Sequence, residues 1–453
     1  MHKLKPPEIV VLSFLVAIVL GTILLSLPVA RAGEGAFPLI DRVFTATSAT
    51  CVTGLVVKDT GTFFSPFGKA VILLLFQCGG LGIMTLSMLF AILLGRKLTI
   101  KDNLVIQSAL DHHKVEGLPR LIAYILLITF GLEAAGALCL FLRWNITENW
   151  SIAQTATQAI FHSVSAFCNA GFSLFKGSFM GFRGDPFINI TMVALIFLGG
   201  IGFVVLMDIP KIRLFKGRGM IFAKITLQSK IALAVSAILI VVGTSLIFLM
   251  ERGRLMAGMS FGEKAWSALF QSVTARTAGF NTLPIGALSA PVLLVIIALM
   301  FIGASPGSTG GGIKTCTFGI IMVAAWSMAR GKKNISIFGR TIPKEVFHKV
   351  FCVFIAAIIW IFAISVALAL SERGHADGFG YSYFLKILFE VTSAFGTVGL
   401  SAGITAQLTT VGKALIILTM FVGRIGPLIL ALMIALNKDV LVYKYPEERV
   451  MVS

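Results

Sequence analysis

The sequence predicts an all-α polytopic membrane protein, and three observations lead to this fold class. Of its 453 residues, 57% are hydrophobic and only 13% are charged, whereas soluble domains carry roughly 25% charged residues. Most of its long apolar stretches reach the ~20 residues that a helix needs to cross a hydrocarbon core; they cover residues 9–30, 187–207, 231–250, 291–303, 350–370 and 414–436. A short motif also recurs four times along the chain, which indicates internal repeats.

The repeated motif ends in a glycine that is followed by leucine or phenylalanine. Its four copies align without gaps, at residues 48–55, 165–172, 273–280 and 393–400. Each copy follows a segment too short to span a membrane, with a full apolar helix expected before and after it; these short segments are 41–50, 151–167, 264–275 and 383–395. A second glycine landmark follows each motif at a similar interval, at residues 79–82, 199–202, 303–307 and 423–426.

The repeating unit is therefore predicted to be helix, half-helix, glycine turn and helix. A single membrane domain, residues 1–453, would hold four pseudo-symmetric helix–pore loop–helix repeats at approximately 8–95, 118–207, 229–327 and 350–437. This arrangement gives eight transmembrane helices and four half-helices around one central pore. Non-helical backbone at membrane depth is tolerated only where it is buried in protein or lines a watery cavity. Close helix packing alone does not explain a glycine at the end of every half-helix.

Four glycine turns that meet on one axis would suit the passage of a cation. Rings of backbone carbonyls replace the water shell of potassium in channels, and such a backbone needs positive φ angles, which glycine adopts freely. The half-helices would also direct their partially negative C-terminal ends at the centre. The expected selectivity filter consists of Val52, Thr53, Gly54, Asn169, Ala170, Gly171, Thr277, Ala278, Gly279, Thr397, Val398 and Gly399.

The second helix of the third repeat contains a segment that cannot form a regular helix. Five glycines and one proline interrupt it, and the segment consists of Gly303, Ala304, Ser305, Pro306, Gly307, Ser308, Thr309, Gly310, Gly311, Gly312, Ile313 and Lys314. A phosphate-binding loop requires lysine directly after the second glycine, but Ile313 intervenes. We expect a movable segment below the filter that obstructs the pore, and the alternative is a static break in packing.

Arg424 interrupts an otherwise apolar helix at the glycine landmark of the fourth repeat. A charge inside the membrane is costly and normally faces a cavity or a partner. We predict that Arg424 is an electrostatic barrier to cations and a hydrogen-bond anchor for the third-repeat segment. An internal structural ion pair is the alternative.

Four further polar residues lie within apolar surroundings. Glu390 and His162 fall on half-helices, where structural anchoring is favoured over direct contact with ions. Glu133 in a membrane helix is ambiguous between the same two roles. Arg276, three residues before Gly279, is expected just behind the filter, where it could donate hydrogen bonds to loop carbonyls.

The distribution of charge and of reactive residues limits the other classes of function. The net charge is +18, and the excess of Lys and Arg between the repeats places both termini in the cytoplasm and favours contact with anionic membrane lipid. No nucleic-acid module is apparent, and neither the cysteines nor the histidines have metal-ligand spacing. No catalytic constellation is recognised, so an enzyme is not expected, and neither is a covalently bound cofactor.

The repeat and its glycines resemble those of the Trk/Ktr/HKT superfamily of potassium transporters, over nearly the whole chain. The chain looks most like the Ktr-type membrane subunits (the KtrB type). The resemblance implies potassium uptake through one pore per chain, with potassium as the permeant ion, in the bacterial cell membrane. It also implies that residues 303–314 are an intramembrane gating loop and that Arg424 faces the pore near it. In plant relatives, serine in place of the first-repeat glycine goes with sodium preference, so Gly54 supports potassium.

The same resemblance implies partners. A homodimer of this subunit would bind a cytoplasmic RCK-type nucleotide-binding regulatory ring (KtrA-like), since the chain itself contains no nucleotide-binding domain. Two other functions stay open. One is a sodium-permeable or sodium-coupled cation transporter of the same fold. The other is a secondary transporter for an organic solute, which normally has inverted or paired repeats and not four parallel ones.

Overall fold

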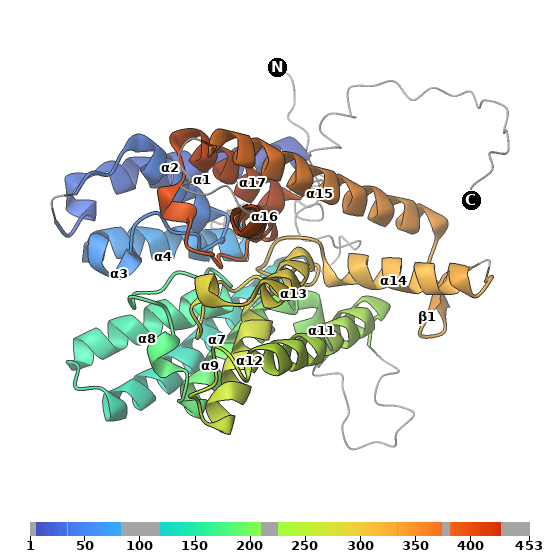
Figure 1. Ribbon diagram of the computed structural model, residues 1–453, viewed down its shortest axis with the longest axis horizontal. Coiled ribbons are helices and arrows are strands. Elements are labelled where there is room, and N and C mark those ends of the chain that lie inside the picture. The colour runs from blue at the N-terminus through green and yellow to red at the C-terminus, as the bar shows by residue number, and fades with distance from the viewer. Residues whose placement is uncertain are drawn as a thin grey trace.

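Three kinds of helix follow one another in the same order four times along the chain (Figure 1). The computed structural model describes residues 6–33, 35–82, 118–209, 225–332, 334–373 and 381–426. Within this part of the chain, the secondary structure is helical except for one two-stranded hairpin. The repeat order is therefore visible directly in the succession of elements.

The first helix of each set is long and apolar. These helices are α1 Pro6–Ser26, α7 Leu118–Thr147, α11 Leu227–Glu251 and α15 Lys344–Ser371. Each contains a stretch long and apolar enough to cross a membrane, and they are the four such helices in the described part of the chain. The chain thus has several apolar spans.

The second kind is a short helix that ends at a glycine motif. The four short helices predicted from the sequence are present, as α2 Leu39–Thr50, α8 Ile152–Phe167, α12 Phe261–Thr274 and α16 Tyr381–Gly396. Their starts are capped by side chains where the sequence supplies a hydroxyl. Ser260 and Glu263 form a reciprocal capping box at α12, and the Ser151 hydroxyl accepts a hydrogen bond from the Gln154 amide at α8. Such caps satisfy backbone donors that have no partner inside the helix.

The third kind of helix stops at the second glycine landmark. These helices are α4 Pro66–Leu81, α9 Pro186–Gly200, α13 Ala290–Phe301 and α17 Thr410–Ile425. Gly82, Gly202 and Gly426 have φ of 81°, 93° and 92°, and a backbone in this region ends a right-handed helix. The expectation of a full apolar helix after the half-helix is therefore corrected in the first, second and fourth sets, because the helix ends at the landmark; the break in the third set was expected.

In the second and third sets, a further helix follows this break. Second halves are described for the second and third sets, as α10 Phe203–Asp208 and α14 Thr315–Ala329, while residues 83–117 and 427–453 lie outside the described residues. The ends of the first and fourth predicted repeats fall in these segments, and the predicted position of both termini concerns residues 1–5 and 427–453, which also lie outside the described residues. The remaining elements are α3 Thr60–Phe63, β1 Ser336–Ile337, β2 Arg340–Thr341, and four 3-10 turns at η1 Pro28–Ala30, η2 Met180–Phe182, η4 Ile285–Ala287 and η5 Thr405–Gln407.

Contacts between the sets follow a closed order. Each first helix packs on the half-helix that follows it, as in the pairs α1–α2, α7–α8, α11–α12 and α15–α16. Each third-kind helix packs on the half-helix of the next set, in the pairs α4–α8, α9–α12, α13–α16 and α17–α2. The last pair joins the fourth set to the first, so the four sets surround a common centre.

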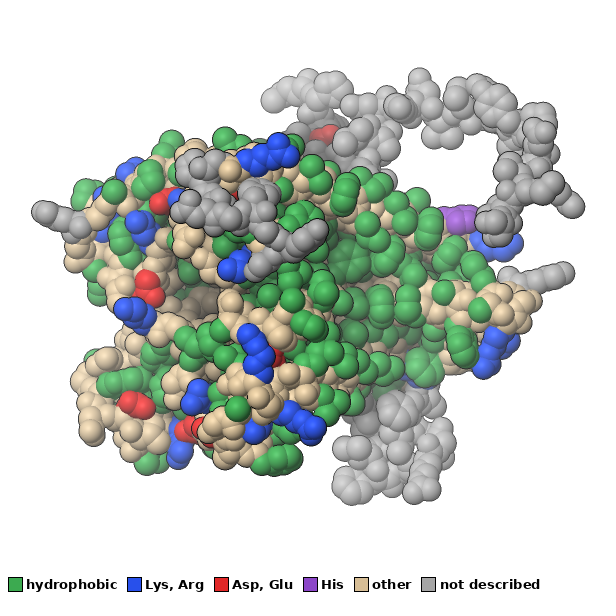
Figure 2. Space-filling view, viewed as in Figure 1, with side chains coloured by type: hydrophobic (Ala, Val, Ile, Leu, Met, Phe, Trp, Pro, Cys, Tyr) green, Lys and Arg blue, Asp and Glu red, His purple; other side chains and the backbone are tan. Residues whose placement is uncertain are grey.

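The surface separates apolar from charged side chains. Figure 2 shows hydrophobic side chains over the middle of this face, between α13 and the α14–α15 end, with charged side chains gathered toward the two ends. Large apolar residues are exposed along the long helices, for example Ile238, Leu127 and Phe362. An exposed apolar band between polar ends is typical of a protein that lies in a bilayer.

Candidate functional site

The four glycine turns share an unusual backbone. Here the glycine loops are residues 52–54, 169–171, 277–279 and 397–399, which are the predicted filter positions. Each has positive φ both at its glycine and two residues before it; the earlier residues are Val52 at 57°, Asn169 at 57°, Thr277 at 79° and Thr397 at 48°. Three of these are β-branched residues, for which such angles are strained. Alternation of left-handed and right-handed backbone turns successive carbonyls toward one side, as a carbonyl-lined cation site requires.

The glycine loops meet one another in a closed ring. A Cβ atom added to Gly54, Gly171, Gly279 or Gly399 would lie less than 3.0 Å from the carbonyl oxygen of the residue before the next glycine in the ring; these carbonyls belong to Ala170, Ala278, Val398 and Thr53 respectively. Any side chain at these positions would therefore push the loops apart. The structure brings all twelve predicted filter residues into this one ring. The two predicted filter residues that precede each glycine are buried from solvent.

A hydroxyl behind each loop holds its curvature. The Ser48 hydroxyl donates to the Leu55 carbonyl at 2.7 Å and the Ser165 hydroxyl to the Phe172 carbonyl at 2.8 Å. In the fourth loop, the Ser393 hydroxyl accepts from the Gly399 amide at 3.1 Å. These hydroxyls bridge the end of a half-helix and the residue at or after its filter glycine. The serine of the repeated motif thus fixes the loop from behind.

In the third set, the hydroxyl behind the loop is five residues before the glycine, whereas it is six residues before it in the other three sets. Thr274, and not Val273, supplies its hydroxyl, which donates to the Phe280 carbonyl at 2.7 Å. The loop amide of Ala278 bonds to the Thr274 carbonyl four residues back, whereas Thr53 bonds to Ser48 five residues back. The gap-free alignment is therefore corrected in the third repeat. Gly279 still aligns with the other filter glycines, but Thr274, and not Val273, aligns with Ser48 at the end of the half-helix.

One side of the ring opens into a cavity of about 220 Å³. All four filter glycines line it, together with polar residues from the segments after the loops; these include Asp59, Thr60, Ser173, Ser178, Asn281 and Ser401. Asp59 is the acidic residue of this lining and also caps α3, accepting from the Thr62 amide at 2.8 Å. A carboxylate in a concave entrance raises the local concentration of cations. The sequence offered no signal for this entrance, since its residues follow the motif at irregular distances.

His162 and Glu390 bind the segments that leave the ring. The Leu174 amide donates to His162 Nε2 at 3.2 Å, so Nδ1 carries the proton that is shared with the Gln158 carbonyl at 2.8 Å. Glu390 accepts from the Ser401 hydroxyl at 2.5 Å, the Ala402 amide at 3.0 Å and the Thr405 hydroxyl at 2.9 Å. Both side chains are buried. Their described contacts are those of structural anchors.

Glu133 on α7 reaches the back of the second loop. Its carboxylate accepts from the Gln77 amide at 3.0 and 3.1 Å, and the Cys168 thiol lies 3.1 Å from the Gln77 side-chain oxygen. Cys168 immediately precedes Asn169 of the second glycine loop. The buried cluster therefore connects α4, α7 and the loop, and it gives the backbone there a fixed support.

The third-repeat loop, residues 302–314, lies against the other side of the ring. The Gly311 amide donates to the Thr397 hydroxyl at 3.0 Å, and a Cβ on Gly310 would collide with the side chains of Thr277 and Ala304. Thr309 reaches across to the second set, where its hydroxyl donates to the Phe167 and Gly199 carbonyls at 3.2 and 3.1 Å. Residues 303–306 and 309–311 are buried. The loop thus occupies the space directly next to the third and fourth glycine loops.

Further bonds keep this loop folded on itself and on α9. The Ser305 amide donates to the Gly200 carbonyl at 2.9 Å, and the Phe203 amide donates to the Gly307 carbonyl at 2.9 Å. The Lys314 ammonium donates to the Gly310 carbonyl at 2.7 Å. Pro306 is buried, and Ile302 pairs with Ile313 in a single β-bridge that closes the base of the loop. The loop therefore has a defined conformation and many polar contacts.

Arg424 joins the loop to the first set. Its guanidinium donates to the Thr309 carbonyl and to the Gly79 carbonyl, which are the loop and the landmark glycine of the first repeat. Among the described residues no carboxylate forms an ion pair with it. The described partners of Arg424 are thus backbone carbonyl oxygens and not a carboxylate, while its roles as an anchor and as a barrier to cations stay predictions.

The landmark glycines allow these close approaches. A Cβ on Gly79, Gly199 or Gly423 would collide with the last carbonyls of a half-helix, which belong to Thr50, Phe167 and Phe395. Gly303 differs, because its Cβ would meet Gly311 of the third-repeat loop. In three repeats the landmark glycine is therefore needed for close packing on a half-helix. In the third repeat it is needed for close packing on the third-repeat loop. No group of three or more His, Cys, Asp or Glu that could hold a metal ion occurs in the described chain.

These features define the class of protein, which is an all-helical, multi-pass membrane protein with several apolar spans. The profile of the TrkH family, described as a cation transport protein, matches residues 6–444. The chain therefore belongs to this family of cation transport proteins, which are transporters and not enzymes.

Relatives and a solved structure agree with this placement. The Ktr system potassium uptake protein B of Bacillus subtilis is 39% identical over 428 residues, 94% of this chain and 92% of its own length. The potassium/sodium uptake protein NtpJ of Enterococcus hirae is 36% identical over 456 residues, 100% of this chain and 98% of its own length. The crystal structure of the potassium transporter TrkH from Vibrio parahaemolyticus matches with a TM-score of 0.70 at 22% identity, covering 96% of this chain and 86% of that one. This last likeness supports the fold.

Proposed function

We propose that this chain is the ion-conducting membrane subunit of a Ktr-type potassium uptake system in the bacterial cell membrane. Eight transmembrane helices and four half-helices, in four repeats, surround one pore, and both termini lie in the cytoplasm. The observation that carries this proposal is the closed ring of four glycine loops, with a cavity on one side and a buried loop on the other. The near full-length similarity to a potassium uptake protein supports the choice of ion.

The ion path follows from this arrangement. A cation enters the cavity next to Asp59, loses water to the carbonyls of the glycine loops, and meets residues 303–314 on the inner side. Backbone oxygens supply the ligands, so the side chains at the filter positions are free to differ between repeats. The third-repeat loop obstructs the path and is the gate, and Arg424 adds a positive charge that opposes cations there while its bonds hold the loop closed.

Ion flux measurements test the proposal directly. The full chain is reconstituted into liposomes. Uptake driven by an inward concentration gradient of the ion is compared for potassium and sodium, with protein-free liposomes as the control. We expect potassium flux well above the control and above sodium flux. Growth of a potassium-uptake-deficient bacterium that expresses the chain is the second measurement. Failure in both assays would contradict the proposal.

A sodium-permeable or sodium-coupled transporter is the second candidate. The similarity to a potassium/sodium uptake protein favours keeping it. Equal sodium and potassium flux, or potassium flux that requires sodium on the same side, would select this candidate. An organic-solute transporter has no supporting observation in the ring, which offers backbone carbonyls and a cavity with few charged groups.

The subunit is also proposed to work as a homodimer with a cytoplasmic RCK-type nucleotide-binding ring. The name of the Bacillus subtilis relative, which assigns it to a Ktr system, supports a multi-subunit assembly. Light scattering of the purified chain in detergent is expected to give the mass of two copies. Co-purification with such a ring, and a change of flux when nucleotide is added, test the second partner.

A further inference from the structure

The half-helices carry a polar residue at one shared position, three residues before the hydroxyl that supports each glycine loop. These residues are Thr45, His162, Gln271 and Glu390. The Thr45 hydroxyl bonds within its own helix. In the second and fourth sets the side chain instead accepts from the backbone amide three residues after the filter glycine. Gln271 therefore occupies the position of an anchor in the third set.

The side chain of Gln271 is not engaged as an anchor in this structure. It is fully buried, and within the described part of the chain neither its amide oxygen nor its amide nitrogen has a hydrogen-bond partner. The residue three positions after Gly279 is Thr282, whose buried hydroxyl is also unpartnered, as is that of Ser267 one turn earlier on α12. Buried polar groups without partners are disfavoured. They point to a bond that this conformation does not make.

The segment after the third loop is held by its neighbour. The Asn281 amide donates to the Ser178 hydroxyl at 3.2 Å, and the Phe179 amide donates to the Asn281 carbonyl at 3.0 Å. Ser178 and Phe179 follow the second loop, so this segment is tied to the second set and not to its own half-helix. Asn281 and Ile285 also line the entrance cavity. The position of the segment therefore shapes one wall of that cavity.

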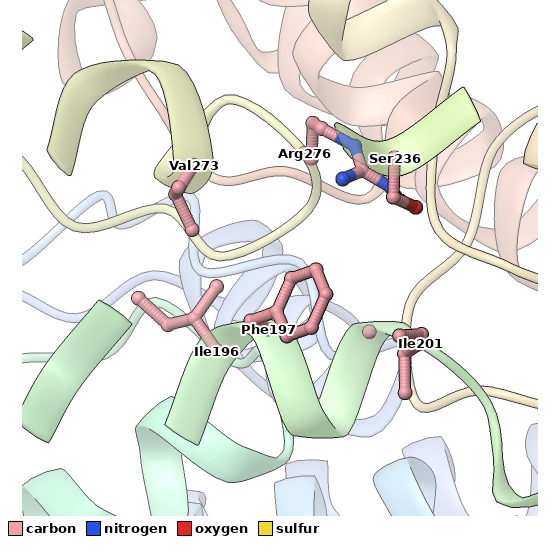
Figure 3. Close-up of a pocket in the computed structure, with 7 residues that line it drawn as sticks. Ile196, Phe197, Ile201, Ser236, Val273 and Arg276 are labelled. Carbon is pink, nitrogen blue, oxygen red and sulfur yellow. The ribbon is translucent and has the colours of Figure 1, made fainter. Parts of the chain in front are cut away.

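The end of α12 before the third loop is fixed on another side. Figure 3 shows Val273 directed toward Ile196 of α9, and Arg276 directed toward Ser236 of α11. Arg276 Nη2 donates to the Ser236 hydroxyl at 2.9 Å, whereas the sequence suggested bonds to loop carbonyls. The helix end thus has contacts with two neighbouring helices. The segment after the loop is the part of the third set that can change its partner.

We propose that Gln271 is the positioning residue of the third repeat and that its amide binds Thr282 in a second conformation of the chain. The segment after Gly279 then leaves the second set and is held by its own half-helix, as in the second and fourth sets. Each conformation makes one group of hydrogen bonds and lacks the other, which is typical of a two-state element.

The second conformation is assigned to the open gate. In the present conformation, Gly310 of the third-repeat loop packs on the Thr277 side chain of the third glycine loop. The alternative arrangement of the third set belongs to the state in which that contact is released. Its effect on ion flux rests on the proposed function, whereas the pairing of Gln271 does not, so the two can fail separately.

Replacement by leucine distinguishes a missing bond from a formed one by the sign of its effect on stability. Gln271→Leu removes both unpaired atoms at similar volume, so the midpoint temperature of the detergent-solubilised full chain should rise by on the order of 2 °C. His162→Leu removes bonds that are present and should lower the midpoint. An unchanged or lower midpoint for Gln271→Leu would show that the amide is already paired, by water or by protein, and would overturn the proposal.

Potassium flux in proteoliposomes tests the role of the second conformation. Gln271→Leu cannot bind Thr282, so its flux should fall several-fold although the protein is more stable. Gln271→Glu keeps an oxygen that accepts a hydrogen bond, and it should retain more flux than the leucine variant. A residue that only packs in the core would change flux and stability in the same direction. Wild-type flux in the leucine variant would contradict the assignment.

The matched control is Gln158→Leu on α8. Gln158 also has a buried side-chain oxygen without a partner in the described structure, but it lies one turn before the anchor position of its set. Its flux should equal that of the wild type. If Gln271→Leu does not fold, Thr282→Val replaces it, and it should also raise the midpoint temperature because it removes an unpaired hydroxyl with little change of shape.

A structure of the full chain with Gly310→Ala, Gly311→Ala and Gly312→Ala combined gives the direct test. We expect the Gln271 amide to lie within hydrogen-bond distance of Thr282 once the third-repeat loop has moved from the ring. A moved loop with Gln271 still unpaired would refute the proposal. An ordered water that pairs both Gln271 atoms in the wild type would refute it as well, whether or not the protein conducts potassium.

Discussion

The first and third glycine loops place their glycines in equivalent positions of the ring, but the residues around these two loops differ. The first loop is closed by Ser48, backed by the neutral Cys51, and followed by a helix whose Gly79 packs on the half-helix end. The third loop has its hydroxyl one residue nearer the glycine, is backed by Arg276, and is followed by α13, which ends in the third-repeat loop. The ring therefore constrains each repeat only at its glycine and at the carbonyl before it.

This difference separates two roles of the repeated unit, which are to form the ring and to make contacts outside it. Contacts inside the ring need four equivalent backbones, because every glycine packs on the carbonyl of its neighbour. Contacts outside the ring need no equivalence, so the third repeat can hold a loop and the fourth an arginine that binds it. Symmetry belongs to the ring of glycine loops, and asymmetry belongs to the proposed gate. Four substitutions test this division.

The largest effect is expected for Gly399→Ala in the ring. Gly399 has φ of 90°, and its Cβ would collide with the Thr53 carbonyl. Potassium flux in proteoliposomes should fall by roughly tenfold or more, because both strain and collision distort the carbonyl positions. Gly403→Ala is the control, since Gly403 has φ of 95° with open space around it. Equal losses in both variants would show that backbone strain alone, and not the ring contact, is responsible.

A large change is also expected when Gly310, Gly311 and Gly312 are replaced together by alanine. Cβ atoms at the first two would meet the side chains of Thr277 and Thr397, and Gly312 has φ of 69°. The loop must move away from the ring, so flux should change several-fold, on the order of 1–2 kcal/mol in the closed-state energy. Gly181→Ala, at a site with open space, is the control. Unchanged flux at normal expression would remove the gate assignment.

A moderate effect is expected for Arg424→Ala. The variant loses two hydrogen bonds from a charged donor to the Thr309 and Gly79 carbonyls, each worth about 1.5–3 kcal/mol, and it removes a positive charge from the path. Basal potassium leak should rise, measured in proteoliposomes that contain this chain alone. Arg424→Lys retains the charge and should show an intermediate leak. Lower basal flux in the alanine variant than in the wild type would contradict both assigned roles.

The smallest effect is expected for Thr274→Val, which removes the third-loop hydroxyl with little change of shape. The lost bond to the Phe280 carbonyl should lower the free energy of unfolding by about 1 kcal/mol, measured as a lower midpoint temperature. Val273→Thr, which adds a hydroxyl at the position of the gap-free alignment, is the paired variant. If Val273→Thr stabilised the protein and Thr274→Val had no effect, the one-residue shift of the third loop would be wrong.

The sequence was sufficient for the parts of the molecule that depend on glycine. Glycine tolerates positive φ and close backbone approach better than any other residue, so the four loop glycines, the ends of the half-helices and the irregular third-repeat segment were predicted close to where they lie, whereas the positive φ of Val52, Asn169, Thr277 and Thr397 was not. The family was also predicted correctly from these residues. The polar character of Glu390 and His162 suggested anchors, and their described hydrogen bonds go to the segments after the loops.

Other features could not be read from the chain alone. The shift from Val273 to Thr274 is invisible because neighbouring residues can supply the same hydroxyl in either register. The break of the second helices at Gly82 and Gly202 was missed because apolar composition continues across it, and only the backbone angle reveals the turn. The cavity beside Asp59 is built from four segments after the loops, whose relation exists only in space.

The contact between the last and the first set has a consequence for how the chain is assembled. Lys413 on α17 and Asp41 on α2 form an ion pair at 2.7 Å, with side chains only 12% and 5% exposed. Among the residues that the structure describes, Lys413 is the ion-pair partner of Asp41, so the Asp41 carboxylate lacks this counter-charge until α17 is inserted, and an unpaired buried charge is costly. The earliest half-helix to leave the ribosome is thus completed by the latest described helix. Premature termination before Lys413 would leave the opening repeat incomplete as well, so the damage from a truncated product would extend to both ends of the fold.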